Sequence, residues 1–431
     1  MRAGQRTSIW PALFLAIVVA LALVVAGCGA GSCSHPVPPG SGGTGGTGGG
    51  TSAGGPGDGA CGLPGSGGNN GGGGGGSSFF ALLYFMDGDF VNVDAASVTS
   101  SGTLSVLSGF TSPQVPASNS RSMVIANQQF LYVALGSGGI AGLSINPNSG
   151  ALAQIANSPF ATPTTGTADL VATDPLGQFL FVGSVNSPVI WVFQINPTTG
   201  GLTSVPGSPF TAPSHLLQTG NSMTVDASGS FLYVGQASQS LGVVGFAINS
   251  SGALAEIAGN PFKLGVAQVH ANPAAEFLLG VAATPNQAGS AITKEISVFS
   301  IGINGVPTLV SSPVATDFAP YDFAILPSGT SVYTFGIDTT TGTLGSIEGF
   351  NMDTSTGALK AIAGSPFASI PSAFGCQFEP TGSFAFCFQN SSGTIFSGGT
   401  SFSVLTVSST GTLSHTSDLA VNNDFPFAVT N

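Results

Sequence analysis

The sequence predicts an all-β fold, a seven-bladed β-propeller of four-stranded antiparallel blades. Three observations predict it. Residues 79–431 repeat a pattern of short apolar segments every 46 to 54 residues, a period typical of propellers and solenoids. The clearest segment occurs seven times, and turn residues separate the segments that follow it. The last repeat ends in a strand-like segment that the first repeat lacks, so the two ends of the domain can complete one blade.

A strand of the type Phe-Leu-Tyr-Val marks each repeat. The seven copies begin at Leu82, Phe130, Phe179, Phe231, Phe277, Ser331 and Phe384. A second strand follows each marker, as in residues 189–195, and leads into a turn such as the Asn-Pro-Thr-Thr-Gly of residues 196–200. Because proline presets φ and glycine accepts a positive φ, these turns predict hairpins.

A third and a fourth strand complete each repeat, and four short antiparallel strands make one blade. The third strand ends at a corner of the type Ser/Asn-Pro-Phe, which begins at Ser158, Ser208, Asn260 and Ser365. The fourth strand leads into the next marker. Residues 427–430 have no marker after them, and residues 82–85 have no fourth strand before them, so we expect these two segments to pair. The alternative is an open array or two sandwiches, which would leave exposed sheet edges.

The amino terminus has the organisation of an export signal. Two arginines precede an apolar run, residues 10–26, and small residues lead to a cysteine. The segment Val25-Ala26-Gly27-Cys28 resembles the lipobox of bacterial lipoproteins, which implies a signal peptide over 1–27 and acylation of Cys28. The alternative is an uncleaved anchor, although the run is shorter than the ~20 residues of a spanning helix. We therefore expect a lipid-anchored protein of the bacterial cell envelope, periplasmic or at the outer membrane or surface.

Residues 28–78 are predicted to form a disordered linker between this lipid anchor and the propeller, residues 79–431. Glycine fills 24 of the 50 positions from 29 to 78, and such a segment buries too little apolar surface to offset its chain entropy. Cys33 and Cys61 lie in this linker, and the sequence leaves open whether they pair.

The charge of the chain excludes some partners. Lys and Arg number 6 against 18 Asp and Glu, and charged residues make up 6% of the chain. No basic surface exists to neutralise phosphates, so we expect no nucleic-acid partner. After removal of the signal peptide the basic residues are Arg121, Lys263, Lys294 and Lys360. We therefore expect the lipid, and not charge, to hold the protein at a membrane.

The motifs of residues 179–210 resemble those of a known family. They are Phe-Leu-Phe-Val at 179–182, Asn-Pro-Thr-Thr-Gly-Gly-Leu at 196–202 and Pro-Gly-Ser-Pro-Phe at 206–210, repeated with changes in the neighbouring units. Over about 350 residues the chain resembles the lactonase-type, 6-phosphogluconolactonase-like, seven-bladed propellers. The resemblance implies a ligand face at one mouth of the central channel, with His, Arg and acidic side chains from the loops before the innermost strands.

Those loops supply the candidate site residues. The expected binding residues are Asn119, Arg121, Asn221, Tyr321, Asp322 and Asp424, with Asp317 beside them. Candidates for catalysis are Arg121, His215, Asp169 and Asp322. No cofactor is required and no metal site is assigned, although a ring of Asp and Asn oxygens suits a divalent cation such as Ca²⁺. The alternative is that these side chains cap loops and form Asx turns.

Other chemically interesting residues are expected to be structural. His270 lies within an inner strand and should be packed, His415 lies on a third strand toward the rim, and Trp191 should pack between blades. No Gly-x-Ser-x-Gly, His-Glu-x-x-His or Cys-x-x-Cys motif occurs.

Two cysteines of the last repeat are expected to form a disulfide. A hairpin with residues 380–383 as its loop sets Cys376 opposite Cys387. Directly opposed Cβ atoms lie roughly 4.5–5.5 Å apart, close enough for a bond in an oxidising compartment.

Two functions fit the sequence. The first is a noncatalytic, monomeric envelope lipoprotein whose propeller is a binding platform for a neutral or weakly anionic ligand, a polysaccharide or a protein. The alternative is an extracytoplasmic lactone hydrolase or isomerase acting at the channel mouth. The shortage of basic and His residues favours the first, because a phosphorylated lactone calls for several cations.

Overall fold

Every secondary-structure element that the structure describes is a β-strand. The computed structural model describes residues 79–87, 92–115, 122–162, 166–185, 187–211, 219–236, 240–282, 293–341, 343–368, 373, 375–390, 400–421 and 423–430. Within these ranges we find no helix long and apolar enough to cross a bilayer. The predicted signal peptide, Cys28 and the linker lie outside them, so the domain boundaries stay predictions.

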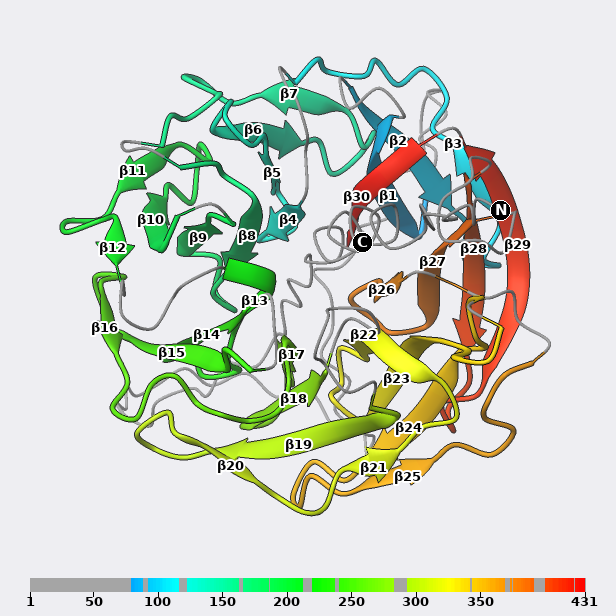
Figure 1. The fold of residues 1–431 in the computed structure, drawn as a ribbon. Coiled ribbons are helices and arrows are strands. Elements are labelled where there is room, and N and C mark those ends of the chain that lie inside the picture. The colour runs from blue at the N-terminus through cyan, green and yellow to red at the C-terminus, as the bar shows by residue number, and fades with distance from the viewer. Residues whose placement is uncertain are drawn as a thin grey trace, which may run out of the picture. The chain divides into compact units, whose positions relative to one another are not determined.

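The strands form seven antiparallel sheets around a central axis (Figure 1). Blade 1 contains β1 (Ala81–Asp87), β2 (Val93–Val98), β3 (Leu104–Val106) and β30 (Asn423–Thr430). Blade 2 contains β4 (Met123–Ala126), β5 (Phe130–Ala134), β6 (Ile140–Ile145) and β7 (Leu152–Gln154). Blade 3 contains β8 (Leu170–Thr173), β9 (Phe179–Gly183), β10 (Val189–Ile195), β11 (Leu202–Ser204) and the short β12 (Phe210–Thr211).

The remaining blades follow the same order. Blade 4 contains β13 (Thr219–Val225), β14 (Phe231–Gln236), β15 (Val243–Ile248) and β16 (Leu254–Glu256). Blade 5 contains β17 (Gln268–Ala271), β18 (Phe277–Val281), β19 (Glu295–Ile301), β20 (Pro307–Leu309) and β21 (Val314–Ala315). Blade 6 contains β22 (Ala319–Ile325), β23 (Ser331–Ile337), β24 (Glu348–Met352) and β25 (Leu359–Ala361). Blade 7 contains β26 (Gly375–Phe378), β27 (Phe384–Asn390), β28 (Thr400–Val407) and β29 (Leu413–Val421).

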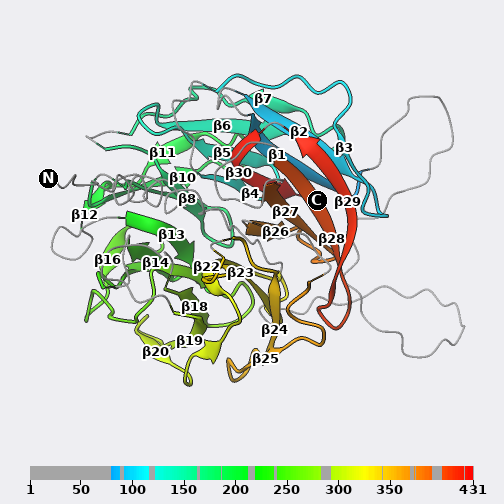
Figure 2. The same cartoon turned by 45° about the vertical axis from the view of Figure 1, so that its right-hand side comes forward.

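The carboxyl-terminal strand closes the ring, which confirms the prediction. β30 pairs antiparallel with β1, with Leu82 opposite Thr430 and Phe85 opposite Phe427 (Figure 1 and Figure 2). The pairing runs further than predicted, to Asp87, because a register shift after Phe85 lets the ladder continue. The innermost strands contact one another in the cyclic order β30, β4, β8, β13, β17, β22 and β26, and β26 again contacts β30.

The hydrophobic core lies between blades. Marker strands are buried on both faces, as Leu180, Phe181 and Val182 are fully buried, and this explains why they are uninterrupted apolar runs. Each core cluster combines side chains from adjacent blades; Trp191 of blade 3, for example, packs in one cluster with Tyr132 of blade 2. The packing role predicted for Trp191 is therefore confirmed.

Hydrogen bonds from marker tyrosines join successive blades. The phenol donates to the carbonyl of a glycine in the outer turn of the next blade: Tyr84 to Gly150, Tyr132 to Gly200, Tyr233 to Gly305 and Tyr333 to Gly411, at 2.6 to 2.8 Å. Burial raises the pKa of all four phenols, so they remain protonated donors. The seventh seam, from blade 7 to blade 1, uses Ser417, whose hydroxyl donates to the Gly102 carbonyl at 2.7 Å.

The Ser/Asn-Pro-Phe corners replace a strand partner. At Ser158, Ser208 and Ser365 the hydroxyl accepts a hydrogen bond of 2.9 Å from a backbone N–H of β6, β10 and β24, respectively, the strand that follows the marker. Asn260 does the same with its side-chain oxygen. The polar residue before each proline therefore accepts a hydrogen bond from a backbone N–H that has no partner on the short outer strand.

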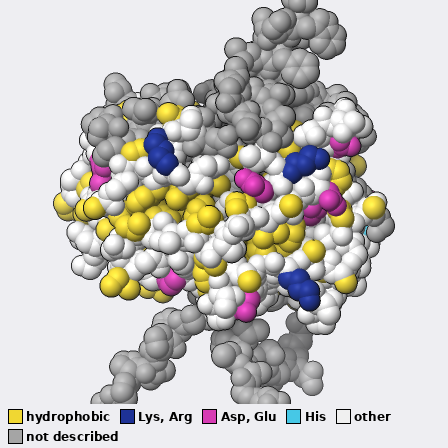
Figure 3. All heavy atoms as spheres, turned by 60° about the horizontal axis from the view of Figure 1, so that its bottom comes forward, with side chains coloured by type: hydrophobic (Ala, Val, Ile, Leu, Met, Phe, Trp, Pro, Cys, Tyr) yellow, Lys and Arg dark blue, Asp and Glu magenta, His cyan; other side chains and the backbone are white. Residues whose placement is uncertain are grey.

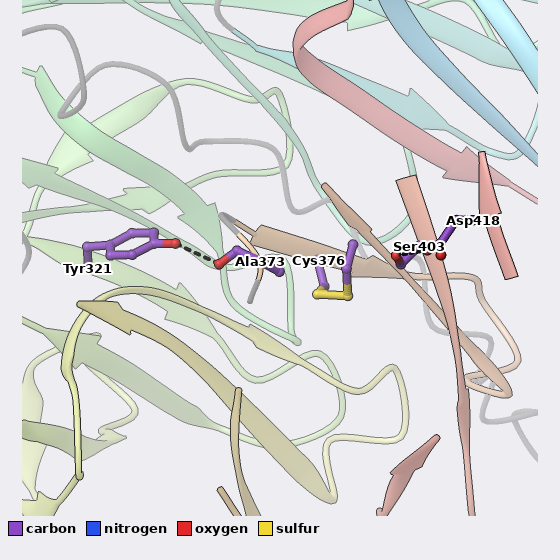
Figure 4. Close-up of a disulfide and its surroundings, with 6 residues drawn as sticks. Tyr321, Ala373, Cys376, Ser403 and Asp418 are labelled. Atoms are coloured by element: carbon purple, nitrogen blue, oxygen red, sulfur yellow. Dashed lines mark hydrogen bonds between the residues drawn. A yellow bond between two sulfur atoms is a disulfide. The ribbon is translucent and has the colours of Figure 1, made fainter. Parts of the chain in front are cut away.

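A disulfide joins the two inner strands of blade 7. Cys376 lies opposite Cys387 in the predicted register, and a bond connects them. Both residues are buried. Figure 4 shows the bond beside Ala373, whose carbonyl accepts a 2.8 Å hydrogen bond from the Tyr321 hydroxyl of blade 6. The disulfide thus lies next to a contact between blades 6 and 7.

Two carboxyl groups meet between blades 4 and 5. Asp226 is fully buried in the turn after β13 and accepts a hydrogen bond of 2.6 Å from the Phe231 N–H. Glu276 precedes β18. Burial, the charge of Asp226 and a hydrogen bond with it raise the pKa of Glu276 to about 7. Glu276 is therefore protonated in the folded state over a pH range in which it is ionised in the unfolded chain.

We expect the deletion of residues 425–431 to abolish the cooperative thermal transition, because the inner edge of β1 then has no partner. Differential scanning calorimetry of the deletion variant measures this, and deletion of Asn431 alone is the control. A deletion variant that melts within a few degrees of the intact protein would show that β30 is not needed for closure.

We expect Glu276→Gln to change how stability depends on pH. The raised pKa means that the folded wild type binds an extra proton between pH 4.5 and 7, so its stability falls as pH rises through this window. The variant should lose this fall and melt higher than wild type at pH 8. Asp226→Asn, which removes the neighbouring charge, should weaken the same pH dependence. If the melting temperatures of wild type and Glu276→Gln change with pH by the same amount between pH 4 and 8, the prediction is wrong.

Candidate functional site

The predicted site residues fall into three groups. Asn119, Arg121 and His215 lie outside the described residues. Asn221 and Asp424 lie in β13 and β30, and their side chains are outside the described part. The structure describes the remaining four, which are Asp169, Asp317, Tyr321 and Asp322.

Asp322 belongs to a buried polar cluster between blades 5 and 6. Gln268 and His270 are two residues apart on β17, so their side chains leave the same face of the strand, and both reach Asp322 on β22. The Gln268 amide nitrogen donates to Asp322 Oδ1 at 2.8 Å, and His270 Nε2 lies 3.0 Å from the same oxygen. The three residues are at most 5% exposed. We call them the β17–β22 cluster.

A register shift in β22 orients Asp322. Pro320 pairs with Gly336 and Asp322 with Phe335, which leaves Tyr321 as the extra residue. Asp322 contacts His270, and the ring of Phe323 also meets His270 edge-on, at 4.7 Å between centroids. Two successive side chains of β22 therefore face β17, which regular alternation would not allow.

Tyr321 points the other way. Its hydroxyl donates to the Ala373 carbonyl of the chain entering blade 7 (Figure 4). Burial, with a smaller effect from the Asp322 charge, raises the pKa of this phenol well above its usual value. Tyr321 is therefore a neutral group that links blade 6 to blade 7, beside the cluster and not in it.

Hydroxyl side chains position the inner strands around the cluster. The Ser222 hydroxyl of β13 accepts a hydrogen bond from the Val269 N–H at 2.8 Å, and the Thr224 hydroxyl accepts one from the Ala271 N–H at 3.1 Å. These two bonds hold β17 on both sides of His270. Ser122, just before β4, accepts a longer one from Val171 of β8 in the same way. Sequence reasoning did not identify Gln268, Ser222 or Thr224, although polar residues recur at inner-strand positions.

The other described acids have different environments. Asp169 is 2% exposed and accepts hydrogen bonds from the Val185 N–H and the Thr167 hydroxyl, as a loop cap does. Asp317 is exposed, and its backbone N–H donates to Glu348 at 2.9 Å. Burial raises the pKa of Glu348, which also accepts a bond from the Phe318 N–H. Glu348 thereby holds the segment that enters β22.

The two described histidines differ in kind. His270 is packed, as expected, and also paired with Asp322. His415 lies on the outer strand β29, 2.9 Å from Asp418 Oδ1, and the Ser403 hydroxyl donates to the same oxygen. Because both bind one oxygen of Asp418, which Figure 4 shows beside Ser403, the histidine does not lie between serine and carboxylate as in a catalytic triad. Among the described residues no group of three or more His, Cys, Asp or Glu could hold a metal ion.

The exterior is poor in charge. On the face shown in Figure 3 the Lys and Arg side chains are few and separated, and most of the coloured surface is uncharged or apolar. Lys263 donates to the carbonyls of Ser240 and Leu241, and Lys294 to that of Asp317. These three cation–carbonyl contacts do not form a basic patch that would attract phosphates.

Comparisons with known proteins agree with the fold. No family model matches the sequence and no curated protein matches it. A candidate 6-phosphogluconolactonase of Bacteroides uniformis superposes with a TM-score of 0.61 at 16% identity, over 81% of this chain and 98% of that one. A second, from Bacteroides fragilis, gives 0.60 at 14% identity, over 82% and 99%. The periplasmic gluconolactonase PpgL of Pseudomonas aeruginosa gives 0.56 at 14% identity, over 82% and 99%.

These likenesses span nearly the whole of the compared chains, and at this level of identity they concern the fold alone. The order of the strands, the closure by β30 and the superpositions all indicate the same fold. The chain has the seven-bladed propeller fold of the lactonase-type proteins.

Proposed function

We propose that this chain is a cell-envelope lipoprotein whose propeller binds a neutral or weakly anionic ligand at the inner strands β17 and β22. The observation that carries the proposal is the β17–β22 cluster, three buried side chains that hydrogen-bond one another across two inner strands. Buried polar groups are costly unless they are paired, and here Gln268 and His270 both pair with Asp322. A fixed amide, imidazole and carboxylate are suited to orient hydroxyl or carbonyl groups of a ligand.

Charge selects the ligand class. Asp322 and Asp169 are buried acids of the inner ring, and the chain has 12 more acids than bases. The resulting negative field disfavours a sugar phosphate. A bound divalent cation would reverse the local sign, and Ca²⁺, which takes oxygen ligands, is the cation to test.

A lactone hydrolase is the second candidate, and the His270–Asp322 pair is the observation that favours it. A carboxylate that holds an imidazole in one orientation is the usual support of a general base. A periplasmic gluconolactonase has the same fold, which supports a sugar lactone as the substrate class. It also supports an extracytoplasmic location for this chain. Against it, the imidazole Nε2 that would act as the base is already paired with Asp322 Oδ1 at 3.0 Å.

We expect a neutral sugar lactone or oligosaccharide to raise the melting temperature of the purified propeller. A ligand at about 100 times its Kd adds roughly 2.7 kcal/mol to stability, enough for a shift of a few degrees. Asp322→Asn should abolish the shift, whereas Asp353→Asn, in an exposed turn after β24, should retain it. Calcium and glucono-δ-lactone are the first probes. A shift that survives in a folded Asp322→Asn variant would place the ligand elsewhere.

We expect no hydrolysis of 6-phosphogluconolactone beyond its spontaneous opening unless a divalent cation is added, because the acidic inner ring repels the phosphate. Base uptake at constant pH measures the reaction, with and without a chelator. Turnover in the presence of the chelator that is lost in Arg121→Ala would establish the hydrolase in place of the binding platform.

We expect the mature protein to begin at an acylated Cys28. Mass spectrometry of the amino-terminal peptide from membranes of a bacterial expression host checks this. The control is Cys28→Ser, which removes the acyl acceptor, and its product should carry no lipid and keep its signal peptide. A mature chain with an unmodified Cys28 or with Met1 in place would contradict lipid anchoring.

A further inference from the structure

A cavity of about 600 Å³ opens between blades 6 and 7, and no function considered above uses it. It lies where β22 ends and β23 begins, and where β26 and β28 end, at the opposite end of the inner strands from the loops that enter them. Its lining consists of Leu326, Ser328, Thr330, Ser331, Asn351, Met352, Gly382, Ser383, Val407, Ser408, Ser409, Thr410 and Gly411. None of these residues is charged. We call this cavity the blade 6–7 pocket.

The pocket exists because one side chain departs from the repeat. In the other six seams the first residue of the marker strand is large and apolar, and it packs against the outer-turn glycine of the next blade. A Cβ added to that glycine would lie within 3 Å of Phe130 at Gly200, Phe179 at Gly252, Phe231 at Gly305, Phe277 at Gly357, Phe384 at Gly102 and Leu82 at Gly150. In blade 6 the marker begins with Ser331, and the corresponding point on Gly411 lies 2.8 Å from Ile362 Cδ1 and 3.1 Å from both the Ser331 hydroxyl and Asn351 Oδ1.

The floor of the pocket is polar. Ser331 is 3% exposed and donates to Asn351 Oδ1 at 3.1 Å. The Tyr333 hydroxyl donates to the Gly411 carbonyl at 2.7 Å, and burial raises the pKa of Tyr333 to about 12, with a smaller opposite effect from its hydrogen bond with Ser331. Asn351 is exposed toward the solvent. Ser331 and Asn351 therefore form a hydrogen-bonded pair where the other blades have a phenylalanine or, in blade 1, a leucine.

Hydroxyl groups also form the rim. On one side the hydroxyl oxygens of Ser328 and Thr330 are hydrogen-bonded at 2.7 Å, and on the other side those of Ser408 and Thr410 are hydrogen-bonded at 2.9 Å. A hydroxyl both donates and accepts, so each pair can turn its hydrogens to match a ligand. Leu326, Met352 and Val407 add apolar surface to the lining.

We propose that the blade 6–7 pocket binds an uncharged sugar unit. A sugar presents hydroxyls that need partners able both to donate and to accept, together with C–H faces that need apolar contact. The lining supplies both and supplies no charge. The volume lies within the range of small-molecule sites, roughly 300–1,000 Å³. An ionic ligand would find no countercharge, and an apolar one would leave the Ser331–Asn351 pair buried without water.

This site is separate from the β17–β22 cluster. The pocket lies between blades 6 and 7, and its residues follow β22 and β26. The cluster lies between blades 5 and 6, with Gln268 at the start of β17 and Asp322 in the middle of β22. The proposal therefore does not depend on the function proposed above, and variants of one site leave the other intact.

Titration calorimetry with glucose, galactose, maltose and cellobiose tests the proposal, with glucuronate as the charged comparison. We expect saturable binding of at least one neutral sugar and weaker binding of glucuronate. Ser331→Phe introduces the residue that five of the other six blades have, so it should abolish that binding while the melting temperature stays equal or rises. Asp322→Asn should leave it unchanged, which separates this pocket from the inner-strand site.

A second pair of variants covers the case in which Ser331→Phe does not fold. Asn351→Ala removes one polar partner from the pocket and should weaken binding about tenfold, the effect of one hydrogen bond of roughly 1.4 kcal/mol. Ser300→Ala is its matched control, because Ser300 holds the equivalent cross-strand position opposite Phe277, and it should bind as wild type does. Absence of binding by all four neutral sugars, or binding that persists in both folded pocket variants, would overturn the proposal.

Discussion

The packing between blades is the constraint on which the rest of this protein depends. A marker strand such as residues 179–182 is buried on both faces, so a single blade would expose an apolar sheet face to water. Each blade is stable only between two others, and the ring must therefore close. The tyrosine-to-glycine hydrogen bonds and the aromatic rings on those glycines repeat the same contact from seam to seam, and β30 supplies the last of the seven inner strands.

This constraint also decides where function can lie. Because strand interiors are committed to apolar packing, polar side chains concentrate near strand ends and in the connections. The β17–β22 cluster lies on two inner strands between blades 5 and 6, and the blade 6–7 pocket lies at the turns that follow the inner strands. In both places a local feature makes room for polar groups: a register shift beside Asp322, and a serine at position 331 where five of the other six blades have phenylalanine. The fold shared with gluconolactonases sets these positions without specifying chemistry.

The candidate site was only partly predictable. Asp322 and Tyr321 follow from the repeat alignment, because both enter an inner strand. The opposite directions of their side chains could not be predicted. They result from a one-residue register shift in β22, which the residue types around it do not reveal. The pairing of His270 with Asp322 joins residues 52 positions apart on neighbouring blades, and Asp169 caps its own loop.

The sequence by itself determined the number of blades, the four-strand order, the closure by the carboxyl terminus and the Cys376–Cys387 register. Each of these depends on local periodicity and turn chemistry, which a repeat displays several times over. Only the tertiary structure decided which polar groups meet across a seam, that Asp226 raises the pKa of Glu276, and that Ser331 lines a cavity. Those outcomes depend on the distance between side chains of different blades, and that distance is set by packing around the whole ring.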